Sequence, residues 1–189
     1  MTIVVTDPAV GEVLTLAEVK AHLRVETGDE DGLIEGLIRT AREHLESAAG
    51  LSLLAQGFRL FLDDWPKAHA VLIRKHPVRT VDAVCVYDEE GLPQEVDLST
   101  VTLDAARRPA RLVVAAIRAP ARLINGIEID FTAGFGESGA DVPGVLKRAM
   151  LTHIAAMYET RGAVAAAAQP ATVPAGYERL IAPYRRRAI

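Results

Sequence analysis

The chain has 189 residues, of which 50% are hydrophobic, 5% aromatic and 24% charged, with a formal net charge of −4. This length suits one domain with a modest insertion, and it allows a core without covalent staples. The mild acidity identifies no partner by itself, although a free nucleic-acid-binding domain is normally basic.

The single cysteine, Cys85, excludes an intramolecular disulfide and a cysteine-rich zinc site, and fits synthesis in a reducing cytoplasm. Residues 1–5 lack the basic start and apolar run of a signal peptide. No uncharged apolar stretch reaches the roughly 20 residues that cross a bilayer, so we expect no membrane partner.

Two helices are predicted near the start. The run Thr15-Leu16-Ala17-Glu18 forms a capping box, which predicts a short helix ending near Arg24 or Val25. An acidic turn follows, in which Asp29 or Asp31 is expected to cap a second helix. That helix runs to about residue 49 with Gly50 as its terminator, and its apolar side chains share one arc: Leu33, Ile34, Leu37, Ile38, Ala41, Leu45 and Ala48.

The middle third favours strands. Apolar and β-branched runs separated by turn residues predict strands over 58–62, 71–74, 81–87, 101–103, 111–114 and 127–132. Asn125-Gly126 between apolar runs predicts a hairpin turn. We therefore expect a small antiparallel β unit set between helices.

Helices return after residue 140. Asp141-Val142-Pro143 predicts the start of a helix that runs to about Arg161. One predicted apolar arc consists of Val145, Leu146, Ala149, Met150, His153, Ala156 and Met157. Leu151, Ile154 and Tyr158 lie beyond that arc and are candidates for contact with a neighbouring subunit.

The last segment begins with an alanine- and proline-rich stretch, 162–175, which predicts an extended linker. A short helix near 177–181 leads into Pro183-Tyr184-Arg185-Arg186-Arg187. The three arginines could contact DNA phosphates, bind an acidic protein surface or remain solvated. The linker and Tyr184 favour a segment that folds on a partner.

The predicted fold class is α+β, with a mainly helical core and a small antiparallel β unit inserted between helices. Residues 1–56 and 134–189 are assigned to the helical core and its C-terminal tail, and residues 57–133 to the inserted unit.

Motifs of catalysis are missing from the sequence. It contains no phosphate-binding Gly-x-x-x-x-Gly-Lys loop, no Gly-x-Gly-x-x-Gly motif and no Gly-x-Ser-x-Gly elbow. The glycine-rich run 132–136 is interpreted as a tight turn, because Glu137 and Asp141 would repel phosphate. The five histidines show no metal-ligand spacing. We predict no catalytic residues, no metal, no cofactor and no enzymatic activity.

Stretches in four regions together resemble the phage head–tail connector (adaptor) family, in the form in which a β unit interrupts the helical core. The first region is 14–25 with the acidic turn after it, the helix from Leu33, and Glu46, Gly50 and Leu53 at its end. The second consists of Ile73, 76–78, Val81, Val84 and 87–88, and the third of 129–136, 142–143 and the helix to 162. The fourth is Leu180 with 183–185. The alanine-rich composition suits a high-GC bacterial genome, and hence a gene transfer agent particle, which is a domesticated phage.

The resemblance implies a passive mechanical role. Members form a ring, usually dodecameric, below the portal, and the ring extends the DNA channel and docks the tail. The implied partners are the portal protein, further copies of the chain, a tail-side connector or stopper protein, and double-stranded DNA that passes without sequence-specific binding. The implied location is the neck of a virion or virus-like particle assembled in the bacterial cytoplasm.

C-terminal segments of the family reach into the portal. This maps portal docking onto Tyr177, Leu180, Pro183, Tyr184, Arg185, Arg186 and Arg187. The alternative function is a DNA-packaging or nucleic-acid-binding protein that uses the basic tail, which would show salt-dependent duplex binding. An enzyme would need convergent polar groups in a pocket, and the sequence shows none.

Overall fold

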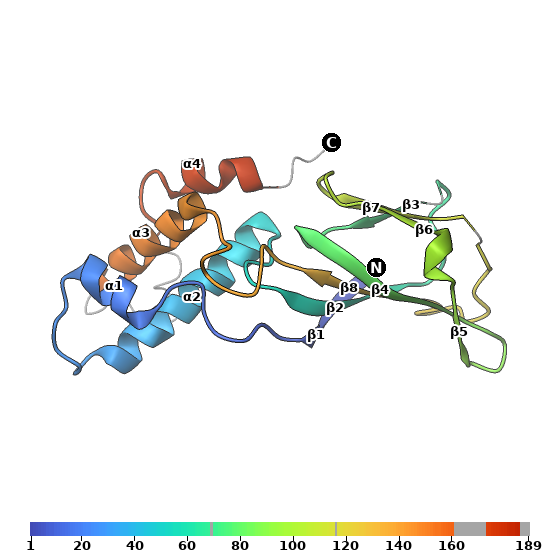
Figure 1. Ribbon diagram of the computed structural model, residues 1–189, viewed down its shortest axis with the longest axis horizontal. Coiled ribbons are helices and arrows are strands. Elements are labelled where there is room, and N and C mark those ends of the chain that lie inside the picture. Colours follow the sequence, from blue (N-terminus) through green and yellow to red (C-terminus); the bar gives the residue numbers. More distant parts are fainter. Residues whose placement is uncertain (69, 116, 161–172, 186–189) are drawn as a thin grey trace. The chain divides into compact units, whose positions relative to one another are not determined.

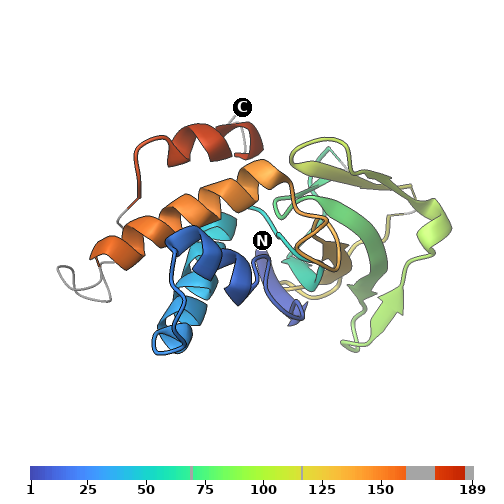
Figure 2. The same ribbon diagram turned by 60° about the vertical axis from the view of Figure 1, so that its left-hand side comes forward.

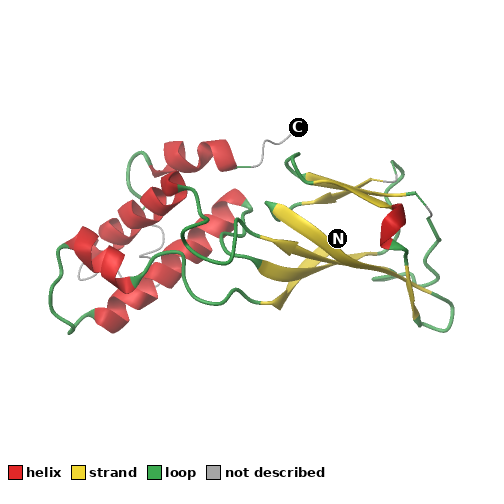
Figure 3. Ribbon diagram, viewed as in Figure 1, coloured by secondary structure: helices red, strands yellow, loops and turns green. Residues whose placement is uncertain are grey.

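The computed structural model describes residues 1–68, 70–115, 117–160 and 173–185. The chain divides into two compact units (Figure 3). The β unit contains residues 1–9 and 55–135, and the helical unit contains residues 10–54 and 136–189. Strands occupy nearly as much of the described chain as helices do. The α+β class is confirmed, whereas a mainly helical core is not.

Helix α1 (Leu16–Leu23) begins where the sequence predicts. The Thr15 hydroxyl accepts a hydrogen bond from the Glu18 amide at 3.2 Å, and the Glu18 carboxylate accepts one from the Thr15 amide at 2.8 Å. These reciprocal bonds are the predicted capping box. The helix ends at Arg24, whose left-handed backbone, with φ of 58°, turns the chain into the acidic loop.

Helix α2 (Asp31–Ala49) is the longest helix of the described chain. The predicted aspartate cap is wrong, because the N-cap is Glu30 and no side chain bonds the free amides there. Asp31 lies in the first turn instead, where it forms an ion pair of 2.5 Å with Lys20 of α1. The predicted terminator is confirmed, since Gly50 adopts a φ of 70° that suits glycine.

Helix α3 (Gly144–Thr160) packs against α1, α2 and the short helix α4 (Tyr177–Ile181), which lies along it in Figure 2 and continues into a 3-10 turn, Ala182–Tyr184. α3 begins at Gly144, three residues after Asp141, whose carboxylate accepts hydrogen bonds from the Ser138 amide and hydroxyl. Among the described helices, none is long and apolar enough to cross a bilayer.

The helical core lies between these helices and the segment that follows α2. Its most buried side chains, each at most 2% exposed, are Leu14, Val19, Ile34, Ile38, Ala41, Leu45, Leu51, Leu53, Leu54, Leu146, Ala149, Met150, Ile154, Met157, Tyr177 and Ile181.

The β unit consists of two antiparallel sheets (Figure 1). The five-stranded sheet has the order β1 (Thr2–Asp7), β2 (Gln56–Leu62), β8 (Ile127–Ala133), β4 (Val78–Tyr87) and β5 (Pro93–Glu95). The three-stranded sheet has the order β3 (Ala70–Ile73), β7 (Ala110–Val114) and β6 (Val101–Asp104). All six predicted strands are confirmed, and β1 and β5 were not predicted.

Alternating residues of the two sheets form one apolar core. Along β2 and β8 every second side chain is buried, as the two-residue period of a strand requires. The Phe58 and Phe131 rings stack there with centroids 5.4 Å apart. On the opposite face of the larger sheet, Arg59 binds Asp130 through two nitrogens at 2.6 and 2.8 Å. This bidentate pair satisfies charges that are only partly exposed.

The predicted hairpin at Asn125-Gly126 is wrong. Strands β7 and β8 lie in different sheets, so the chain between them crosses from one sheet to the other. Asn125 has a left-handed φ of 52°, and a Cβ atom on Gly126 would lie 2.6 Å from the Arg122 carbonyl oxygen. The sequence signal therefore marks a tight backbone approach inside a crossover loop.

One buried carboxylate, that of Glu46, holds three segments of the helical unit together. Glu46 is 8% exposed, and its Oε1 accepts a hydrogen bond of 2.8 Å from the Leu53 amide. Its Oε2 lies 3.3 Å from a guanidinium nitrogen of Arg42, which also binds Glu12 at 2.8 Å. The N-terminal segment, α2 and the segment after α2 thus share one network.

We predict that Glu46→Ala lowers the free energy of unfolding by about 3–5 kcal/mol, because it leaves a half-buried arginine and a buried amide without this acceptor. Glu43→Ala is the matched control. Glu43 lies 3.9 Å from the same arginine with its side chain 63% exposed, so its loss should cost at most about 0.5 kcal/mol. Urea denaturation of both variants measures the difference, and equal losses would contradict the role assigned to Glu46.

Candidate docking surfaces

The C-terminal helix α4 is anchored on its own unit by Tyr177. This side chain is 1% exposed and lies between His44 of α2 and His153 of α3. The ring centroids of Tyr177 lie 5.6 Å from His44 and 5.4 Å from His153, and the two histidine rings are 4.7 Å apart. Tilted ring packing of this kind stabilises contacts between elements.

The Tyr177 hydroxyl lies 3.1 Å from His44 Nδ1. Burial raises the pKa of the phenol to about 12, the Glu178 carboxylate adds to the rise, and Arg185 opposes it. The phenol therefore stays protonated at neutral pH and can donate its proton to Nδ1. A buried hydroxyl with a partner of this kind fixes the orientation of α4.

The predicted portal-docking residues occupy different environments. Tyr177 is buried within its own unit, where it anchors α4, and its direct contact with a partner stays a prediction. Leu180, Tyr184 and Arg185 are half-buried, and Pro183 is exposed. Arg185 also forms an ion pair with Glu178 on α4. Arg186, Arg187 and most of the predicted linker, 162–172, lie outside the described residues.

One side of α3 remains partly exposed. Leu151 and Tyr158, both predicted interface residues, are half-buried, and the Tyr158 hydroxyl donates to Glu30. Ile154, the third predicted interface residue, is fully buried in its own unit and does not lie on this side. Val145, predicted to face the core, is 44% exposed. Val145, the exposed Arg148 and Leu151 follow one another at three-residue spacing, and together with Tyr158 they lie on the side of α3 away from its buried residues; we call this side the α3 face.

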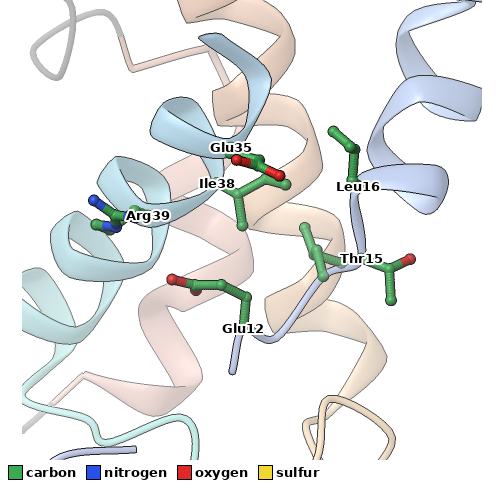
Figure 4. A pocket seen from close by; sticks show the side chains of 7 residues that line it. Glu12, Thr15, Leu16, Glu35, Ile38 and Arg39 are labelled. Atoms are coloured by element: carbon green, nitrogen blue, oxygen red, sulfur yellow. The ribbon is translucent and has the colours of Figure 1, made fainter. Parts of the chain in front are cut away.

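A small pocket of about 290 Å³ opens between α2 and the segment before α1 (Figure 4). Its lining mixes apolar and charged groups: Glu12, Leu14, Thr15, Leu16, Glu35, Ile38 and Arg39. Glu12 is held by Arg42 at 2.8 Å, and no histidine, cysteine or serine lines the space. Its size is near the lower end for ligand sites.

The single cysteine and the metal-ligating residue types give two further observations on the described chain. Burial, and then the carboxylates of Glu95, Glu128 and Asp130, raise the pKa of the Cys85 thiol, which lowers its thiolate content. Within the described residues, no three His, Cys, Asp or Glu side chains are grouped to hold a metal. Three parts of the described chain keep exposed or partly exposed groups: the α3 face, the segment after α4 and the edge strand β1.

Comparison with known proteins identifies relatives of the whole fold. The family model of phage gp6-like head–tail connector proteins matches residues 13–107. A chain from the neck of an empty gene transfer agent particle, computed with C6 symmetry, is 32% identical with a TM-score of 0.80. Chains from a native gene transfer agent virion and from a native neck, computed with C12 symmetry, are each 30% identical with TM-scores of 0.79. Each alignment covers 100% of this chain and 97% of the other. No curated protein matches the sequence.

The anchoring role of Tyr177 predicts a distinctive alkaline behaviour. Because its pKa is about 12 in the folded state and about 10 in the unfolded state, folding retains a proton that the unfolded chain releases. Stability should therefore fall by about 2–3 kcal/mol as the pH rises from 10 to 12. In Tyr177→Phe this decrease in stability between pH 10 and 12 should be absent. At neutral pH the free energy of unfolding should be lower by about 1 kcal/mol, because the hydrogen bond to His44 is missing.

Urea denaturation at several pH values measures this behaviour, with Tyr184→Phe as the control outside the histidine contact. A wild-type slope that persists in Tyr177→Phe would contradict the assignment.

Proposed function

This chain belongs to the phage gp6-like head–tail connector family, and we propose that it is a ring subunit between the portal and the tail of a gene-transfer-agent-like particle. The main support is the near-complete alignment, at 30–32% identity, with chains of gene transfer agent particles, two of which come from the neck. Its role is structural. The ring, its place below the portal and the DNA channel that it extends are parts of the proposal.

A closed ring needs two different surfaces on each subunit, because every copy contacts one neighbour with each side. The α3 face is one such surface. Val145 is 44% exposed, and Leu151 and Tyr158 keep partial exposure beside it. Arg148 adds a cation that an acidic neighbour would complement. Burying this face between copies would remove apolar groups from water.

The segment after α4 is the proposed portal contact. Tyr177 and Ile181 fasten α4 to its own unit, so the chain leaves that unit from a defined point. Pro183, Tyr184 and Arg185 follow, and the sequence adds Arg186 and Arg187. A rigid anchor lowers the ordering cost of the residues that dock, while the arginines can bind carboxylates on the portal.

The remaining partners follow from this placement. A tail-side connector or stopper protein would bind the other end of the ring, and double-stranded DNA would pass through the channel without sequence-specific contacts. The net charge of −4 gives such a channel little general attraction for phosphate. The particle neck is the proposed location, with assembly in the bacterial cytoplasm. We propose no catalytic activity.

Deleting residues 183–189 tests the portal contact. The truncated protein should keep its fold, because the buried anchors of α4 remain, and should lose at least roughly tenfold in affinity for the portal. Thermal unfolding measures the fold. Co-sedimentation with the portal encoded alongside, followed by electron microscopy, measures attachment.

Glu26→Gln in the exposed loop after α1 serves as a control for a surface change that leaves the tail and the α3 face intact. Unchanged portal binding by the truncated protein would contradict the assignment of the tail. Salt-dependent binding of duplex DNA that disappears with the tail, together with no portal binding, would favour the nucleic-acid-binding alternative.

A further inference from the structure

Strand β1 leaves one edge of the five-stranded sheet open. Among the strands of the described chain, β1 pairs with β2 alone, from Thr2 opposite Phe61 to Asp7 opposite Gly57. Five of its six residues are exposed, including Val4 at 41% and Val5 at 51%. The backbone groups on the far side of β1 therefore have no strand partner among the described residues. An open edge of this kind is a template for another strand.

The two edges of this sheet differ in protection. At the other edge, β5 has three residues and begins with Pro93, so it offers a short edge with a missing amide donor. Strand β1 has six residues with the run Ile3-Val4-Val5 and contains neither proline nor lysine. Natural proteins commonly blunt exposed edges with short length, proline or lysine. β1 has none of these, and its register shift lies at its end, between Val5 and Asp7, so Thr2–Val5 forms a regular open edge, as expected for an edge that is covered in the assembled state.

The side chains of β1 indicate what would cover it. Ile3 pairs with Leu60 and packs partly on the apolar core, and Val5 pairs with Phe58 on the same side of the sheet. Val4 pairs with Arg59 on the other side. A strand added beside β1 would extend the core over Ile3 and Val5, with apolar residues at every second position.

We infer that the open edge of β1 is occupied by a strand of a second copy of this chain, so that the sheet continues from one subunit to the next. This inference rests on the proposed ring. The ring supplies the occupant, because in a closed ring every copy has an identical neighbour on each side. The partner strand is an edge other than β1, since β1 paired with β1 would be a two-fold contact and would stop at a dimer.

Site-specific crosslinking tests the occupant. Val4→p-benzoylphenylalanine is incorporated into the full-length chain, rings are assembled on the portal, and the neck is irradiated after electron microscopy confirms the ring. The expected product is a covalent dimer of this chain, with the crosslink mapped by mass spectrometry to another edge strand. The same substitution at Glu26, in the exposed loop after α1, is the control and should give no crosslink to an edge strand.

The outcomes separate the two proposals. A ring in which position 4 crosslinks to the portal, to its own counterpart or to nothing overturns the strand addition and leaves the ring intact. If no ring forms under any assembly condition, the proposed function is wrong, and with it the inference that a second copy pairs with β1.

A pair of proline variants tests the backbone contact. Adjacent residues of an antiparallel strand direct their amides to opposite sides, so of Ile3→Pro and Val4→Pro one removes an amide that faces β2 and the other an amide that faces the open edge. The edge-facing variant should keep its thermal stability and require roughly tenfold more protein to assemble rings. Two stable variants that assemble as wild type would overturn the inference.

Discussion

The helical unit depends on one buried acid. Glu46 accepts a hydrogen bond from the Leu53 amide, where the chain has left α2 and runs through a fully buried stretch, Leu51 to Leu54. Buried backbone groups outside regular structure need partners, and a side chain must supply what a helix or sheet does not. Arg42 balances the charge and extends the network to Glu12 before α1. The segment that connects helix to sheet is thereby held in place before any tertiary contact of the β unit is considered.

In the β unit, charged side chains on one face of the larger sheet also bind one another. Arg59 is bound to Asp130 through two nitrogens and lies 3.3 Å from Glu128, which accepts a hydrogen bond from the Tyr87 hydroxyl. The hydrogen bond to Asp130 is the main reason that the pKa of Arg59 lies above its ordinary value. Rows of satisfied charges keep this face polar and leave the opposite face free for the core. An interlocked face of this kind makes β2 a stiff support for the open strand β1.

Sequence patterns predicted the elements whose signals are local. The capping box at Thr15, the terminator Gly50 and the short helix at 177–181 depend on a few neighbouring residues, and each is present. The errors arose where a distant contact decides the outcome. Asn125-Gly126 has the dipeptide of a hairpin, but the strands that flank it belong to different sheets. Asp31 could cap α2, yet Lys20 of α1 holds it in an ion pair.

The candidate surfaces show the same division between local and distant signals. Helical periodicity correctly indicated that α3 is apolar over a wide arc, but the buried arc excludes Val145 and includes Ile154. Tyr177 illustrates the limit more sharply. The sequence shows an aromatic residue after a long linker, which suits a docking plug as well as an anchor. Only the folded chain brings it between His44 and His153 and assigns it to the anchor.

An anchor and a docking tail make opposite demands on one short segment, and the structure separates them along the chain. Tyr177 and Ile181 are buried on one side of α4, whereas Pro183 is exposed immediately beyond it. If Tyr177 moved into the portal, the histidine pair and the core beneath it would be exposed to water, and this exposure costs free energy. Because the buried residues of α4 anchor the segment and the residues after them dock, the core need not be exposed. The subunit can stay folded while the residues after Ile181 adapt to a partner, which suits a connector whose neighbours on its two sides differ.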